Sequence, residues 1–151
     1  MLIQDSREQS PLLFNEKDFD DIVVEGLSVG DYGCRVDGTL IPIIFERKSL
    51  NDLWGTMLKG HKRFERELAR AEKAGIALIL AIEGSMTDVY EGCKYSKFKG
   101  ESMLKMLASF RVRHGLEYHF FNNRREMAKF ITDVFQAVAR DMKRKSPLPS
   151  L

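Results

Sequence analysis

The sequence lacks the features that mark several protein classes. Its 151 residues include only two cysteines, Cys34 and Cys93, and four prolines. A disulfide framework or a four-ligand zinc site is therefore unsupported. The longest apolar run, residues 76–82, is too short to span a bilayer, and the N-terminus carries acids instead of the basic and apolar regions of a signal peptide. These absences predict an intracellular protein without a membrane partner.

A large excess of either charge sign is also missing. Lysine and arginine together number 24 and aspartate and glutamate 22, so the formal net charge is +2. This balance excludes a chain that holds nucleic acid by bulk positive charge alone, but it permits a local basic surface beside a local acidic site. The length suits one domain, which we expect over residues 1–145, followed by a flexible C-terminal tail over 146–151.

Strand-like and helix-like segments alternate along the chain. Strands are predicted near residues 2–3, 22–24, 32–36, 39–45, 76–82 and 117–121, and helices near 49–58, 61–73, 100–114 and 124–145. The Asp37-Gly38 pair between two strand-like runs is a strong hairpin signal, because both turn positions favour a positive φ. This order predicts an α/β sheet with helices on its faces.

The hairpin brings chemically informative residues together. If the turn is centred on residues 37–38, Asp31 faces Ile44 across the two strands. Side chains alternate along a strand, so Glu46 and Lys48 share the face of Ile44. Asp31 is then a diagonal neighbour of Glu46, about 7–8 Å away at the backbone.

This arrangement predicts a cation site. The carboxylates of Asp31 and Glu46 could reach one hard divalent ion such as Mg²⁺ or Mn²⁺, which prefers oxygen ligands. The ammonium of Lys48 could hold and polarise a water molecule beside the ion. Such a site suits phosphodiester hydrolysis. Asp52, in the first turn of the next helix, is either an outer acid of this site or a favourable helix N-terminal charge.

These residues also carry a family resemblance. Gly30-Asp31-Tyr32 followed by Glu46-Arg47-Lys48-Ser49 and Asp52-Leu53 resembles the signature of the XPF-type structure-specific endonucleases, within the PD-(D/E)xK superfamily. Further stretches resemble the family at residues 5–8, 27–29, 63–64, 79–84 and 109–122. The resemblance covers about residues 2–140. It implies an α/β, restriction-endonuclease-like fold with a central mixed β-sheet flanked by helices.

The resemblance also implies roles for particular residues. Asp31 and Glu46, with the backbone carbonyl of Arg47, would bind the metal, and Lys48 would be the catalytic lysine. Supporting residues would be Asp5, Glu8, Arg47 and Asp52. Arg7 and Arg63 would be DNA-binding residues by resemblance. The basic charge around Arg63 adds Lys59 and Lys62 as DNA-binding candidates, although this helix could equally be a solvated face. A second candidate for DNA contact is the basic and aromatic loop with Tyr90, Lys94, Tyr95, Lys97 and Lys99.

The expected function is a Mg²⁺- or Mn²⁺-dependent, structure-specific endonuclease that cuts branched or flapped duplex DNA in repair or recombination. Its location would be cytoplasmic or nucleoid-associated. The resemblance implies a homodimer through the C-terminal helices. Two alternatives stay open: a non-catalytic DNA-binding or scaffold module on the same fold, and a junction-resolving nuclease.

Overall fold

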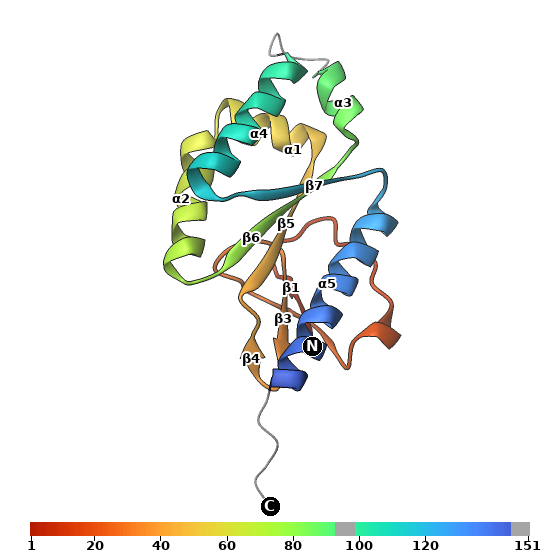
Figure 1. Ribbon diagram of the computed structural model, residues 1–151. Coiled ribbons are helices and arrows are strands. Elements are labelled where there is room, and N and C mark those ends of the chain that lie inside the picture. The colour runs from red at the N-terminus through yellow and green to blue at the C-terminus, as the bar shows by residue number, and fades with distance from the viewer. Residues whose placement is uncertain (93–98, 146–151) are drawn as a thin grey trace, which may run out of the picture.

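The computed structural model describes residues 1–92 and 99–145 (Figure 1). Its elements in chain order are β1 (Leu2–Asp5), η1 (Glu16–Asp18), β2 (Ile22–Glu25), β3 (Tyr32–Val36), β4 (Thr39–Leu40), β5 (Ile43–Ser49), α1 (Leu50–Leu58), α2 (His61–Lys73), β6 (Ala77–Glu83), α3 (Met86–Glu91), α4 (Gly100–His114), β7 (Glu117–Phe121) and α5 (Arg124–Lys145). The proposed tail, 146–151, and the loop residues Lys94, Tyr95 and Lys97 lie outside the described residues, as does Cys93.

The strands form one mixed sheet. Their order is β2-β1-β3-β5-β6-β7, and β4 pairs with β3. The β1–β3 and β3–β5 pairs are antiparallel, whereas β1–β2, β5–β6 and β6–β7 are parallel. Parallel neighbours need a crossover between them, and helices supply two of these crossovers. The predicted α/β fold with a central mixed sheet is therefore confirmed.

Helices cover both faces of the sheet, so its central strands are buried on both sides. Along β6, Leu78, Leu80 and Ile82 belong to a core shared with α1, α2 and α4. The alternate positions Ile79 and Ala81 belong to a second core, shared with α5. Figure 1 shows α5 on the side of the sheet away from these three helices. The apolar run at 76–82 thus has the sequence pattern of a strand buried on both faces.

The register of the central hairpin differs from the prediction. The two β3–β4 pairs nearest the turn follow the expected pairing. Farther along, Tyr32 pairs with Phe45, where an uninterrupted hairpin would pair it with Ile43. Pro42 separates β4 from β5; it has no N–H to donate to a ladder, and the register moves by two residues across this break.

The shift brings the two key acids closer. A shift of two positions leaves every side chain on its predicted face. It places Asp31 opposite Glu46 instead of diagonal to it, because the next pair beyond Tyr32 and Phe45 joins these positions. The predicted diagonal relation was therefore wrong, and the correction makes a shared cation easier to reach.

Two short helices were not predicted from the sequence. The first is η1, a single 3₁₀ turn of three residues. The second, α3, has six residues and begins with a capping box between Ser85 and Asp88. This serine–acid spacing is a recognised helix-start signal, but the helix is too short to show apolar periodicity.

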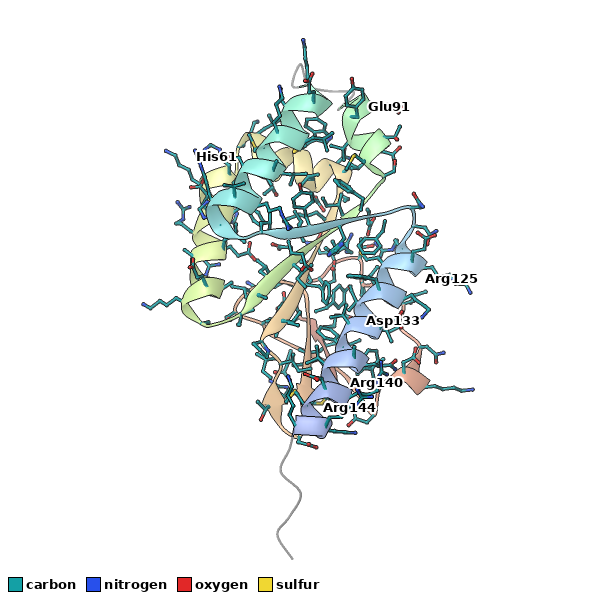
Figure 2. The ribbon with its side chains drawn as sticks, viewed as in Figure 1. His61, Glu91, Arg125, Asp133, Arg140 and Arg144 are labelled. Carbon is teal, nitrogen blue, oxygen red and sulfur yellow. The ribbon has the colours of Figure 1, made fainter. Side chains whose placement is uncertain are left out.

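The long helix α5 directs its apolar stripe inward. Ile131 and Phe135 are buried against the second face of the sheet, and Val134 and Val138 pack beside them. Exposed charged residues labelled along α5 in Figure 2 are Arg125, Asp133, Arg140 and Arg144. Most of the apolar stripe of α5 is thus buried in the core. A search of the described helices finds none with the length and apolarity to cross a membrane.

Candidate active site

A cavity of about 720 Å³ lies beside the end of β5, between the start of β3 and helices α1 and α2. Its ionisable lining residues are the acids Asp5, Asp31, Glu46, Asp52 and Glu67 and the bases Arg7, Lys48, Arg63 and Arg70. Both hairpin acids and the lysine that the sequence singled out therefore face one space.

Asp31 is held in place by the backbone of the neighbouring strand. Its N–H donates to the carbonyl of Phe45 at 2.8 Å, and its Oδ2 accepts the N–H of Arg47 at 2.8 Å. Burial raises the pKa of Asp31 to about 6; the Arg47 N–H opposes this rise, and the charge of Glu8 adds to it. One carboxylate oxygen is thus anchored to the backbone.

Glu46 contributes a buried carboxyl group to the cavity. Its residue is 8% exposed, and Lys48 Nζ lies 3.7 Å from its Oε1. Its Oε2 is buried and has no hydrogen-bond partner among the described residues. Burial raises the pKa of Glu46 to about 8; Lys48 opposes the rise, whereas the charges of Glu67 and Asp31 increase it. A buried carboxylate normally has a donor or a cation beside it.

The residues present fit a hard divalent cation. Asp31 and Glu46 offer carboxylate oxygens from opposite positions on two strands, and the orphaned oxygen of Glu46 marks where positive charge is missing. Over residues 1–92 and 99–145, no three histidine, cysteine or acidic side chains already form a ligand cluster. Two carboxylates supplemented by backbone oxygen or water remain the ligand set that this cavity supports.

The side chain of Arg47 lies on the other face of the sheet. It donates from Nε and Nη2 to Glu8 at 3.0 and 2.8 Å, and from Nη1 to Glu83 at 2.7 Å. Arg124 also binds Glu83. Burial alone would raise the pKa of Glu8, but the hydrogen bond from Arg47 and further donors hold it below its usual value. Glu8 and the Arg47 guanidinium do not line the cavity.

Asp5 forms part of the cavity wall and orders the adjoining loop. It is 2% exposed and accepts bonds from the Leu27 N–H at 2.8 Å and from Arg7 Nε at 3.0 Å. Arg7 also donates to the Leu27 carbonyl at 2.7 Å. Burial would raise the pKa of Asp5, but these donors lower it overall. Asp52 is exposed at the start of α1, where its N–H donates to Ser49 Oγ.

The predicted DNA-binding residues divide into two groups. Arg7 and Arg63 line the cavity, whereas Lys59 and Lys62 are exposed beside it without lining it. Sequence reasoning did not assign Glu67 or Arg70 to the site. Their spacing was the available signal, because positions 63, 67 and 70 recur at helical intervals and share one face of α2.

Comparisons with known proteins agree with this architecture. The family model described as "ERCC4 domain" matches residues 4–134. Two solved structures are similar: XPF from Aeropyrum pernix, at TM-score 0.69 and 18% identity over 95% of this chain and 67% of that one, and XPF from Aeropyrum pernix in complex with DNA, at TM-score 0.61 and 16% identity over 97% and 68%. A comparison with curated proteins gives no match.

These findings confirm the resemblance to the XPF-type nuclease domain and its α/β fold with a mixed sheet flanked by helices. The family match spans the segments that build the cavity, from β1 through α2, and continues into α5. The chain therefore belongs to the ERCC4 domain family.

Proposed function

We propose that this protein is a divalent-metal-dependent DNA endonuclease that hydrolyses phosphodiester bonds. The observation that carries the proposal is the pairing of a buried carboxyl group, Glu46, and a half-buried one, Asp31, with Lys48 in one open cavity. Both acids have raised pKa values because of burial, so the site lacks positive charge that a cation would supply. Membership of the ERCC4 domain family supports a nuclease.

Asp31, Glu46 and the backbone carbonyl of Arg47 would hold Mg²⁺ or Mn²⁺. When bound, the ion would neutralise charge on the scissile phosphate and favour deprotonation of the attacking water. The Lys48 ammonium, 3.7 Å from Glu46, would orient that water and stabilise developing negative charge. Asp5 orders the Arg7 loop, and the side chain of Arg47 fixes β5 from the opposite face.

DNA would approach over α2 and the Arg7 loop. Arg7 and Arg63 lie at the cavity, and further exposed bases on or beside α2 are Lys59, Lys62, Arg66 and Arg70. Basic side chains around an acidic cavity can hold the phosphate backbone while the acids bind the cation. The formal net charge of +2 is compatible with this local separation of charge.

The preferred DNA is proposed by family resemblance. Branched or flapped duplex is the expected substrate, in repair or recombination. A homodimer through the C-terminal helices is proposed on the same ground. Sedimentation velocity over a concentration series tests the dimer, and a single species at the monomer mass would contradict it.

Cleavage assays test the proposed activity. Flap, fork, nicked and four-way-junction DNA are incubated with the wild type, Asp31→Ala and Lys48→Met, in Mg²⁺ or Mn²⁺. We expect each substitution to reduce cleavage by at least about 100-fold, the usual effect of losing such a group. Lys17→Met, at an exposed residue outside the cavity, is the control and should cleave normally.

Undiminished cleavage in both site variants would overturn the assignment. DNA binding without cleavage by the wild type, and without binding of Mg²⁺ or Mn²⁺ in calorimetry, would instead favour a scaffold module. Preferential cutting of four-way junctions over flaps would favour a junction-resolving nuclease.

A further inference from the structure

Glu67 on α2 faces the same cavity from outside the hairpin motif. It lies one turn beyond Arg63 and lines the cavity with Asp31 and Glu46. Its neighbours Phe64, Leu68 and Ala71 are buried in the core. The apolar side of α2 therefore fixes the helix against the sheet, and the Glu67 carboxyl is held beside the strand acids.

Glu67 places a third carboxyl group in the cavity of the two strand acids. The charge of Glu67, like that of Asp31, disfavours the charged form of Glu46. Glu46 Oε2 has no donor among the described residues. Three carboxyl groups that face one cavity repel one another unless a cation lies among them.

Glu67 accepts a long hydrogen bond from the backbone. The N–H of Gly30 donates to Glu67 Oε1 at 3.3 Å, which is beyond the usual range for this bond. Gly30 has a φ of +71°, and a Cβ there would lie 2.4 Å from Ile44 Cγ2, so the backbone at this position requires glycine. Glu67 can exchange such a long bond for a stronger interaction with little loss.

We propose that Glu67 is a third carboxylate of the cation site, contacting the divalent ion through a bound water. The inference rests on the proposed function, because it adds a water-mediated ligand to the site formed by Asp31 and Glu46. A third carboxylate would add negative charge where a hard cation prefers it, and its position on α2 would couple the ion to the helix that carries Arg63 and Arg70.

Cation binding by the full chain without DNA tests the proposal. Mn²⁺ affinity is measured by calorimetry and by electron paramagnetic resonance for the wild type, Glu67→Gln and Glu72→Gln. Glutamine keeps an oxygen that can accept the Gly30 N–H and gains a donor for Glu46, so a purely structural role predicts unchanged or tighter folding. We expect Glu67→Gln to weaken Mn²⁺ binding by about 10- to 100-fold, as for lost supporting ligands. Glu72, exposed on the same helix, is the matched control and should retain wild-type affinity.

The outcomes separate the two proposals. If Glu67→Gln folds normally and binds Mn²⁺ as tightly as the wild type, the third carboxylate is overturned while the two-carboxylate site stands. If the wild type itself binds no Mn²⁺, or Asp31→Asn leaves its affinity unchanged, the proposed metal site fails, and the inference fails with it. Urea unfolding of each variant without metal checks that a lost affinity does not reflect a lost fold.

Discussion

The charged side chains on the two faces of β5 differ in whether their hydrogen-bonding groups have partners. On one face, Arg47 is 10% exposed in its side chain and is bound by Glu8 and Glu83. On the other, Glu46 has Lys48 Nζ at 3.7 Å from its Oε1, and its Oε2 has no hydrogen-bond partner among the described residues. Adjacent residues of one strand thus point into a satisfied ion network and into an unsatisfied acidic cavity.

This difference separates structural charge from functional charge. A buried guanidinium with its hydrogen bonds satisfied stabilises one arrangement and leaves little capacity for a further ligand. A buried carboxyl without donors costs folding free energy and keeps its oxygens available. The network around Arg47 therefore fits a role in holding β5, whereas the cavity around Glu46 fits a role in binding a cation.

The largest effect on stability is expected from removing the arginine of the ion-pair network on the Arg47 face of β5. Arg47→Met would leave Glu8, only 5% exposed in its side chain, without its cation. The loss should be about 3–5 kcal/mol in the free energy of unfolding, typical of breaking a buried pair. Urea unfolding at pH 7 measures it, with Arg66→Met on the exposed side of α2 as the control.

A second substitution distinguishes a charge effect from a packing effect. Adding Glu8→Gln to Arg47→Met removes the orphaned charge and should recover part of the stability, so that the double-mutant cycle shows coupling. Additive losses would mean that the Arg47 stem, and not its charge, stabilises β5.

A smaller, stabilising effect is expected from neutralising Glu46, on the opposite face of β5. The pKa of Glu46 is raised to about 8 from an ordinary 4.5, so the folded protein keeps a proton that the unfolded chain releases. Free energy of unfolding therefore falls as pH rises through this window. In metal-free buffer at pH 8.5, Glu46→Gln should be more stable than the wild type by at least about 1 kcal/mol, the equivalent of one pKa unit.

Urea unfolding at pH 4, 6.5 and 8.5 with a chelator measures this difference. The two proteins should be similar at pH 4, where Glu46 is mostly protonated in both states because the pH lies below its ordinary pKa of 4.5. Added Mn²⁺ should then stabilise the wild type at pH 8.5 and not the variant. An equal pH dependence in both proteins would contradict an unsatisfied Glu46.

The smallest effect on stability is expected from an exposed base at the mouth of the cavity. Arg63→Ala should leave the unfolding midpoint unchanged, because Arg63 is exposed. It should weaken duplex binding and lower the slope of log K against log salt by about one, the signature of a single lost phosphate contact. Fluorescence anisotropy over a salt series measures it, with Lys17→Ala as the control. An unchanged slope would remove Arg63 from the DNA surface.

Much of the fold followed from local patterns. The alternation of apolar runs and helical spacings predicted the helices and strands of the described residues except η1 and α3, although the single strand predicted over 39–45 is divided into β4 and β5. The Asp37-Gly38 pair predicted the hairpin. The register of β3 against β5 was not predictable in this way. It depends on the break at Pro42 and on the pairing of β5 with β6 through seven residue pairs, which no local signal specifies.

The amino-acid sequence by itself determined which residues share a face of β5, because period-two alternation survives a shift of two residues. It thereby grouped Asp31, Glu46 and Lys48. Only the tertiary structure decided that Glu67 from α2 joins them and that Glu8 binds Arg47 on the opposite face. The reason is that these contacts join segments distant in the chain, and their geometry depends on how α2 and the first loop pack against the sheet.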